Sequence, residues 1–289
     1  MRCFLLFVSG FLFFQTCSAQ DKLIQDMQKM IKDSSYGTNA AKGKFYHLRG
    51  IDMYAETYGS GAPLLIIHGN GGSIADFAYQ IPYFSKKYKV ILADSRAQGK
   101  TVDNSDSLSY EMMADDYAAL LSEMKIDSAF VIGWSDGGIN GLLLTIRHPE
   151  KVRKLAVTGA NLWPDTTAVF GDVIDVVMPS YQYLKNKTNK TATEKGSWKL
   201  VRLLLDEPHI PLSDLNRIRI PTLVIGGDHD VIKPQHTLLV AQNIPQSDLW
   251  ILPNSGHSTP IVYRDEFNRK VDDFLSQPYR EISKTKRFF

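Results

Sequence analysis

The hydrophobic residues of this chain gather in short runs that alternate with longer segments of helical periodicity. Short apolar runs bounded by glycine or polar turns are typical of strands that are buried on both faces. Because segments with a helical pattern separate these runs, the chain predicts a parallel sheet built from alternating β and α units, an α/β fold. The runs are Leu64–Ile67, Lys89–Ala93, Ala129–Ile132, Lys154–Val157, Thr222–Ile225 and Leu249–Leu252.

Two segments depart from this alternation. Phe45–Tyr54 and Glu56–Tyr58 alternate polar and apolar residues around Arg49-Gly50, which predicts an antiparallel hairpin at the entry to the sheet. Between Ala160 and Arg219, about sixty residues separate two strands, more than one crossover helix requires. We predict a small helical cap at about 160–219, with helices near Val169–Val177, Tyr181–Lys187 and Lys195–Leu204.

The run that ends at Ile132 leads directly into Gly133-Trp134-Ser135-Asp136-Gly137, and an apolar helical pattern follows from Gly138 to His148. A serine with a glycine two residues away on each side, between a strand and a helix, is the pattern of a nucleophile elbow. The turn is so tight that only small residues fit at the two glycine positions. The sequence therefore predicts Ser135 as a catalytic nucleophile.

A serine is a weak nucleophile at neutral pH and needs a base and an orienting acid. Asp230 follows the run that ends at Ile225, and His257 follows the run that ends at Leu252. The carboxyl ends of parallel strands meet at one edge of a sheet, so we expect Asp230 and His257 to lie beside Ser135. His257 is predicted as the general base and Asp230 as its carboxylate partner. Their rivals are His229, His236 and Asp228.

Acyl transfer also requires donors for the oxyanion of the tetrahedral intermediate. The run Leu64–Ile67 is followed by His68-Gly69-Asn70-Gly71-Gly72, a glycine-rich loop suited to present backbone amides. We predict the backbone amides of Asn70 and Asp136 as the oxyanion donors. His68 is predicted to form structural hydrogen bonds and not to act as a base.

Together these motifs resemble the α/β-hydrolase superfamily, of the AB hydrolase-1 type, from about Lys44 to Leu275. The resemblance implies an α/β-hydrolase fold, with a mostly parallel eight-stranded sheet, helices on both faces and a small helical cap. Asp94–Thr101 resembles the turn Asp-x-Arg-Gly-x-Gly-x-Ser of this superfamily, with Ala97 where glycine is usual. Within the superfamily, the elbow, Gly159–Asn161 and Asp265–Asn268 are similar to the valacyclovir hydrolases, also called biphenyl hydrolase-like proteins.

The resemblance implies a serine hydrolase that needs no metal and no organic cofactor. We expect a carboxylesterase that acts on small esters through an acyl-enzyme. Carbon–carbon bond hydrolases, amidases and perhydrolases use the same triad and stay open, and so does a ligand-binding protein without turnover. In valacyclovir hydrolases the residue that matches Asp136 is assigned to the α-ammonium group of the substrate, which implies α-amino-acid esters. Further candidates for the substrate pocket are Asn161, Trp163, Tyr181, Tyr183 and Trp198.

Composition adds little to this interpretation. The 289 residues, with 44% hydrophobic and 22% charged residues, are enough to bury a core as one α/β domain. A net charge of +2 gives no sign of nucleic acid as a partner. We expect a small-molecule substrate as the partner, and the sequence leaves the oligomeric state open.

The first residues carry a targeting signal. Arg2 precedes the apolar stretch Phe4–Phe14, and small residues end at Ala19, as in a secretory signal peptide too short to span a bilayer. We predict a signal peptide at 1–19 and a mature hydrolase domain at 20–289, exported to the periplasm or secreted. Cleavage after Ala19 would remove both cysteines of the chain. The alternative is a lipoprotein acylated at Cys17.

Overall fold

The structure is a computed structural model, and it describes residues 17–282. One sheet runs through the described chain with eight strands in the order β1-β2-β4-β3-β5-β6-β7-β8. The pairs β1/β2 and β2/β4 are antiparallel and the other pairs are parallel, which confirms the predicted fold class. The strands are β1 (Gly43–Leu48), β2 (Ile51–Tyr58), β3 (Ala62–Ile67), β4 (Tyr88–Ala93), β5 (Ala129–Trp134), β6 (Val152–Thr158), β7 (Thr222–Gly227) and β8 (Ser247–Leu252).

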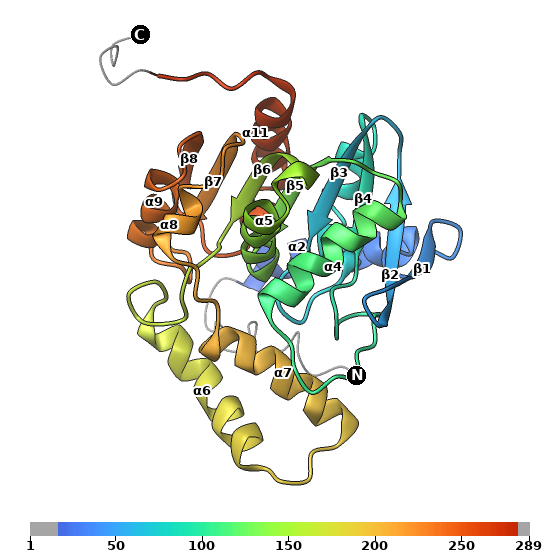
Figure 1. Ribbon diagram of the computed structural model, residues 1–289, viewed down its shortest axis with the longest axis vertical. Helices are drawn as coiled ribbons and strands as arrows, with labels where there is room; N and C mark the ends of the chain where they lie inside the picture. The colour runs from blue at the N-terminus through green and yellow to red at the C-terminus, as the bar shows by residue number, and fades with distance from the viewer. Residues whose placement is uncertain (1–16, 283–289) are drawn as a thin grey trace.

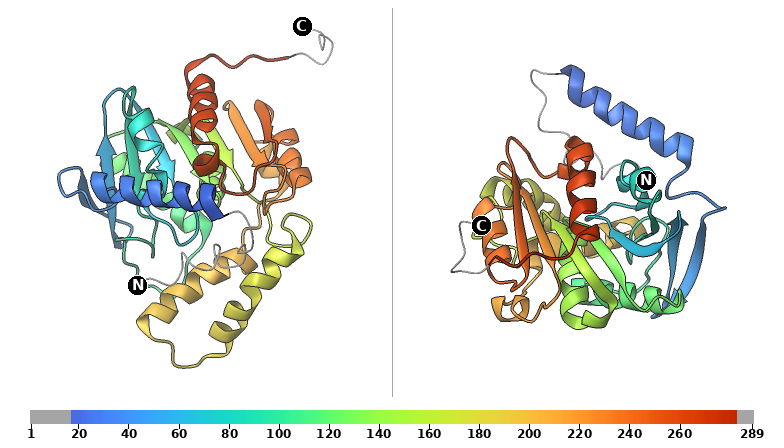
Figure 2. Two further views of the ribbon diagram at one scale, coloured as in Figure 1. Left: turned by 180° about the vertical axis from the view of Figure 1, so that it is seen from behind. Right: turned by 90° about the horizontal axis from the view of Figure 1, so that it is seen from above.

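Helices cover both faces of the sheet, as Figure 1 and Figure 2 show together. One face is covered by α4, α5, α8 and α9, and the other by α2, α3 and α11. The helices are α2 (Cys17–Ser34), α3 (Ile81–Phe84), α4 (Tyr110–Glu123), α5 (Asp136–Arg147), α6 (Gly171–Asn186), α7 (Ala192–Asp206), α8 (Leu212–Leu215), α9 (Pro234–Gln242), α10 (Thr259–Val262) and α11 (Arg264–Ser276), with 3₁₀ turns η1 (Ile74–Phe77) and η2 (Pro149–Lys151).

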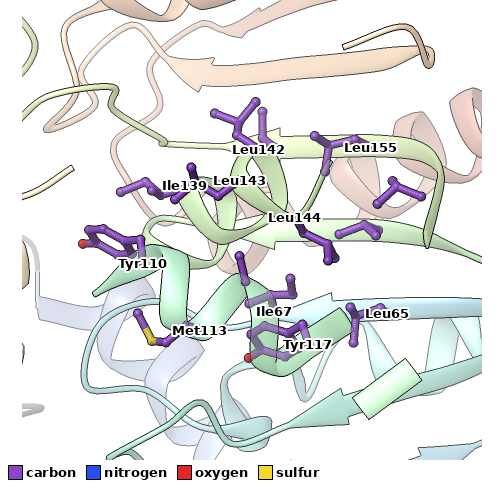
Figure 3. Close-up of a cluster of buried hydrophobic side chains, with 14 of the residues drawn as sticks. Leu65, Ile67, Tyr110, Met113, Tyr117, Ile139, Leu142, Leu143, Leu144 and Leu155 are labelled. Atoms are coloured by element: carbon purple, nitrogen blue, oxygen red, sulfur yellow. The ribbon is translucent and has the colours of Figure 1, made fainter. Parts of the chain in front are cut away.

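The continuous apolar runs arise because each central strand is buried on both sides. In β3, Leu65 and Ile67 belong to the core beneath α4 and α5, whereas Leu64 and Ile66 face the core beneath α3 and α11. Figure 3 shows the first core, where Leu65 and Ile67 lie near Tyr117 of α4 and Leu144 of α5. Burying each such aliphatic side chain contributes about 1.5–3 kcal/mol, so the strand that ends at the glycine-rich loop 68–72 is firmly held.

The entry hairpin is confirmed. Leu48 of β1 pairs with Ile51 of β2 across Arg49 and Gly50. Both turn residues have positive φ, 44° and 76°, the backbone of a type I′ turn that suits the twist of two antiparallel strands.

The segment between β6 and β7 contains the helices α6 and α7, which lie side by side and project from the sheet (Figure 1). The prediction of two helices on either side of Pro179 was wrong, because α6 runs through Pro179 without a break. Proline removes one backbone hydrogen bond inside a helix. In α6 only Leu184 is buried, so water can solvate the carbonyl that is left free.

The start of α7 was predicted three residues too late. The helix begins at Ala192, after a capping box in which Thr191 and Glu194 satisfy each other's backbone amides. The capping box supplies partners for amide groups of the first turn, which extends the helix beyond its apolar part.

At the amino end, α2 packs Met27, Met30 and Ile31 against the core beneath α3 and α11. Most of the proposed signal peptide, residues 1–16, lies outside the described residues. Within residues 17–282 no helix has the length and apolar character needed to cross a membrane.

Candidate active site

Ser135 occupies the sharp turn between β5 and α5. Its backbone has φ 58° and ψ −124°, a conformation that costs a residue with a side chain about 1–3 kcal/mol. The turn is held from outside, since the amide of Ser135 donates to the carbonyl of Thr158 at 2.9 Å. The elbow therefore has the strained geometry that its sequence predicts.

Both glycines of the elbow are required by close backbone contacts. A Cβ on Gly133 would lie 2.2 Å from the carbonyl oxygen of Gly137. A Cβ on Gly137 would lie 2.0 Å from the carbonyl oxygen of Ile67, the last residue of β3. The second contact brings the start of α5 against the strand that leads into the glycine-rich loop 68–72.

The structure brings Ser135, His257 and Asp230 together in one hydrogen-bonded chain. His257 Nε2 lies 2.9 Å from Ser135 Oγ, and His257 Nδ1 lies 2.6 Å from Asp230 Oδ1. Asp230 Oδ1 also accepts the backbone amide of Ile232 at 3.2 Å. With a proton on Nδ1 donated to Asp230, Nε2 is free to accept the proton of Ser135, as a serine triad requires.

The charges of this pair reinforce each other. Burial works against ionisation of Asp230, yet the charge and hydrogen bond of His257 keep the pKa of that carboxyl below its usual value. Burial likewise favours neutral His257, but the carboxylate of Asp230 raises the pKa of the imidazole above its ordinary value. A raised pKa makes His257 a stronger base at the moment when Ser135 loses its proton.

Two residues to which the sequence analysis gave no role position His257. Gly159 has φ +64°, and a Cβ on it would lie 2.7 Å from His257 Cε1. Trp134 Nε1 donates to the carbonyl of His257 at 2.9 Å. The sequence signals for Gly159 are its place directly after a strand, β6, at the same edge of the sheet, and the resemblance of Gly159–Asn161 noted above.

The rival residues are engaged elsewhere. Asp228 accepts the amides of Asn254 and Ser255 at 2.9 and 3.0 Å, as expected of a turn residue, and exposed His229 pairs with it. His236 is buried and accepts the amide of Leu162 at 3.0 Å, and burial lowers its pKa to about 4.

Among residues 17–282, no three His, Cys, Asp or Glu side chains form a cluster suited to a metal ion.

The loop after β3 lies against the nucleophile. A Cβ on Gly69 would lie 3.1 Å from Ser135 Cβ, so the backbone passes directly beside the serine. The amides of Asn70 and Asp136 donate to no other group of the described chain. His68 uses both ring nitrogens, one with the carbonyl of Gly69 at 2.8 Å and one with the amide of Ser95 at 2.9 Å.

The side chain of Asp136 is buried beside the nucleophile, with 3% of its surface exposed. Asn70 Nδ2 donates to Asp136 Oδ2 at 2.9 Å. Burial raises the pKa of Asp136, against the hydrogen bonds of Asn70 and Tyr110 that lower it. No lysine or arginine of the described chain pairs with this carboxylate.

The other candidate pocket residues contact one another or the cap. Asn161 Nδ2 donates to the carbonyl of Trp163 at 3.0 Å. The rings of Trp163 and His236 pack edge to face, with their centroids 4.9 Å apart. Three aromatic residues join α6 to α7. The ring centroids of Tyr181 and Trp198 lie 5.2 Å apart, and the hydroxyl of Tyr183 donates to Glu194. Tyr183 is 58% exposed.

The fold and this site define a class of protein, and comparison with known proteins gives the same class. Residues 62–197 match the family described as alpha/beta hydrolase fold. This similarity to α/β hydrolases confirms the resemblance inferred from the motifs of the chain.

Individual relatives are similar to the chain over most of its length. The chain is 26% identical over 263 residues to the serine hydrolase BPHL of Mus musculus, and the aligned region covers 84% of this chain and 89% of the relative. It is 28% identical over 261 residues to a 2-hydroxymuconate semialdehyde hydrolase of Pseudomonas sp. (strain CF600), covering 79% of this chain and 92% of the relative. The enol-lactonase of Burkholderia xenovorans LB400 has a similar fold, with a TM-score of 0.68 and 21% identity over 81% of this chain and all of that chain.

Proposed function

We propose that this protein is a serine hydrolase that cleaves small carboxylic esters through an acyl-enzyme. The observation that carries the proposal is the hydrogen-bonded chain Ser135–His257–Asp230, at 2.9 and 2.6 Å, with its serine on a strained turn. The small cap, formed by α6 and α7, supports a compact substrate and not a long lipid chain.

The reaction follows from the placement of these groups. Ser135 Oγ attacks the carbonyl carbon of the ester while its proton passes to His257 Nε2. The backbone amides of Asn70 and Asp136 receive the oxyanion, and the alcohol leaves with the proton from His257. Water then attacks the acyl-enzyme with His257 as base, which releases the acid and restores Ser135.

The test is a substrate screen combined with active-site labelling. A fluorophosphonate should label the wild-type protein at Ser135, and p-nitrophenyl esters with short acyl chains should be turned over faster than those with long ones. Amides and carbon–carbon substrates are included, because the relatives include a 2-hydroxymuconate semialdehyde hydrolase and a putative carbamate hydrolase. Binding without labelling or turnover would instead identify a ligand-binding protein.

A second, finer candidate is an esterase for α-amino-acid esters. The observation that favours it is the carboxylate of Asp136, buried beside Ser135 with no lysine or arginine partner in the described chain. A substrate ammonium group would supply the missing positive charge through a charge-assisted hydrogen bond of about 1.5–3 kcal/mol.

Asp136→Asn tests this specificity. The variant keeps the size of the side chain and the backbone donor, so we expect kcat/KM on an α-amino ester to fall about tenfold to a hundredfold. The des-amino analogue of the same ester is the control, and its kcat/KM should change little. Equal losses on both esters, or no loss on either, would remove the amino-acid ester from consideration and leave a general esterase.

We also propose that the protein is exported. Mature protein recovered outside the cytoplasm should begin at Gln20, a residue in the first turn of α2, and should contain no thiol. Intact-mass and amino-terminal peptide analysis measures both properties. A mature chain that begins at Cys17 with an added diacylglycerol would show that the lipoprotein alternative is right.

A further inference from the structure

The side chain of Asn70 joins three elements around Ser135. Its Nδ2 donates to Asp136 Oδ2 at 2.9 Å and to the carbonyl oxygen of Leu200 at 3.1 Å. A primary amide nitrogen carries two hydrogens, so each of them has its own acceptor. One bond reaches the first residue of α5 and the other reaches the cap helix α7. A single side chain therefore links the loop after β3 to both the nucleophile helix and the cap.

The backbone around Asn70 has little stiffness of its own. Gly69 precedes it, and Gly71 and Gly72 follow, with Gly71 at φ +67°. Because glycine allows many backbone conformations, contacts from elsewhere must fix the peptide planes of this loop. Gln98 Oε1 accepts the amide of Gly71 at 2.7 Å and fixes the far side. On the near side, the carbonyl of Gly69 bonds with His68 Nδ1 at 2.8 Å and accepts the amide of Gly72 at 3.2 Å, and the side chain of Asn70 adds its two bonds to these.

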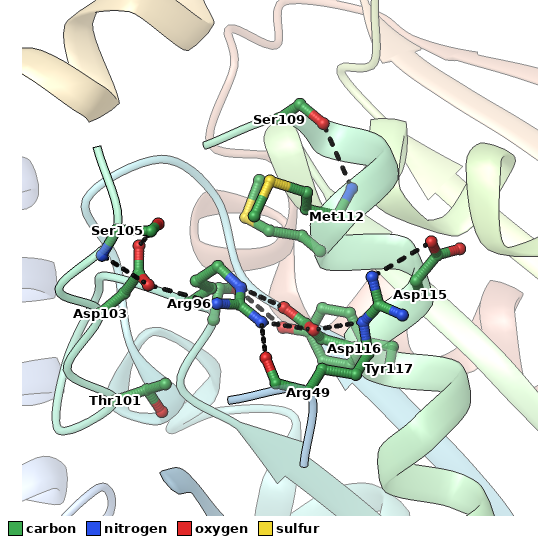
Figure 4. A network of polar contacts seen from close by, with 12 residues as sticks. Arg49, Arg96, Thr101, Asp103, Ser105, Ser109, Met112, Asp115, Asp116 and Tyr117 are labelled. Carbon is green, nitrogen blue, oxygen red and sulfur yellow. Dashed lines mark hydrogen bonds and ion pairs between the residues drawn. The ribbon is translucent and has the colours of Figure 1, made fainter. Parts of the chain in front are cut away.

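The cap helix α7 is fixed on the core next to this contact by a chain of ion pairs. Lys199 Nζ lies 2.9 Å from Asp103 Oδ2, and Asp103 Oδ1 lies 3.2 Å from Arg96 Nη1. Arg96 in turn pairs with Asp116 of α4 at 2.6 Å, as Figure 4 shows. The four side chains are only 0–7% exposed, so breaking the chain would leave buried charge without compensation. These pairs give α7 one preferred position.

We propose that Asn70 is a positioning residue whose side chain couples the docked position of α7 to the alignment of the oxyanion donor. The inference rests on the proposed function, since that donor is the backbone amide of Asn70 itself. When α7 moves, the side-chain amide of Asn70 loses the carbonyl oxygen of Leu200 as an acceptor. The backbone peptide of Asn70, which has glycines on both sides, then gains conformational freedom. A donor stabilises an oxyanion fully only when it is preorganised, so the position of the cap controls the chemical step.

The first test is Asn70→Ala, which removes both side-chain bonds and keeps the backbone amide. We expect kcat on p-nitrophenyl acetate to fall about 10- to 100-fold with KM within about twofold, because a misaligned donor weakens the transition state more than the bound substrate. A trifluoromethyl ketone, whose adduct with Ser135 carries an oxyanion, should bind more weakly by a similar factor. Asn216→Ala is the matched control, since its Nδ2 also donates to a helical carbonyl, that of Leu212, on the exposed surface.

The second test disturbs the cap from its other side. Lys199→Met removes the ion pair with Asp103 and leaves the Asn70 side chain intact, and we expect a smaller fall in kcat. If the two residues act through one coupling, the double variant loses less than the product of the two single losses. Losses that multiply would show that the residues act independently and would overturn the coupling.

Wild-type labelling and turnover are measured first, so the two proposals fail in different ways. An inactive, unlabelled wild type removes the proposed function. An active wild type with unchanged kcat in Asn70→Ala, or with a change in KM alone, removes only the positioning role. Asn70→Gln, which keeps both donors on a longer stem, serves if the alanine variant does not fold, and it should retain more of kcat than a folded Asn70→Leu. Equal kcat in the Gln and Leu variants would also contradict the inference.

Discussion

Ser135→Ala should leave a folded protein whose esterase kcat is lower by about 10⁴- to 10⁶-fold. In the proposed mechanism the hydroxyl oxygen forms the acyl-enzyme, so its removal should abolish that route. Residual turnover over the uncatalysed reaction comes from the backbone donors and from substrate binding. Steady-state kinetics on a short p-nitrophenyl ester, together with loss of fluorophosphonate labelling, measures the effect.

Two further variants show whether this loss belongs to the triad. His257→Ala should lose about as much activity as Ser135→Ala, and the double variant should lose little more, because the two residues act as one unit. Ser122→Ala is the control: this exposed serine donates to the carbonyl of Ala118 in α4 and should keep wild-type turnover. Wild-type activity in a verified Ser135→Ala preparation would falsify the serine mechanism.

The triad could be predicted because its members follow strands, and strands have a strong sequence signal. Ser135, Asp230 and His257 come directly after β5 and in the loops after β7 and β8, and parallel strands bring these ends to one edge of the sheet. The two elbow glycines were predictable for a related reason. A strand that must turn into a helix at once allows no side chain there, and the close contacts of Gly133 and Gly137 agree with this.

The contacts of the cap were not predictable in the same way. Asn70 and Leu200 are 130 positions apart, and Asp103 and Lys199 are 96 apart, with no periodic pattern that pairs them. Helical spacing also cannot separate aromatic residues that line a pocket from those that pack two helices together. Tyr181, a predicted pocket residue, joins α6 to α7 through Asp206 and Trp198, and its role in a pocket stays a prediction.

Local rules failed in the cap for two different physical reasons. Pro179 usually ends a helix, yet α6 continues through it because an exposed helix leaves the lost bond to water. The apolar pattern of α7 predicts a start at Lys195. The capping box of Thr191 and Glu194, which is also present in the sequence, places the start at Ala192. A surface helix is thus defined by its ends more than by its apolar face.

Asp230→Asn should lower kcat by about 10³- to 10⁴-fold while the protein stays folded. The neutral amide cannot stabilise the imidazolium that His257 becomes when it takes the proton of Ser135. The amide also meets backbone donors, since Ile232 and Gly227 both direct their amides at the carboxylate of Asp230. In one orientation the NH₂ group faces His257 and the amide of Ile232, and in the other it faces the amide of Gly227. In either orientation a donor therefore faces a backbone donor.

The pH profile separates this role from a simple loss of structure. Wild-type kcat/KM requires neutral His257, so it should be fully present well above the pKa of that imidazole and be lost as the pH falls through it. The carboxylate of Asp230 raises this pKa, so the acidic limb of the wild type should lie above about pH 6.5, the ordinary value for histidine. Without this carboxylate, burial lowers the pKa of His257 and only the smaller effect of the Asp136 charge opposes it, so the acidic limb of Asp230→Asn should move to lower pH. Asp248→Asn, an exposed substitution on β8, is the matched control and should leave both kcat and the limb unchanged. An acidic limb at the same pH in wild type and Asp230→Asn would mean that Asp230 does not set the charge of His257, and the triad assignment would then have to be abandoned.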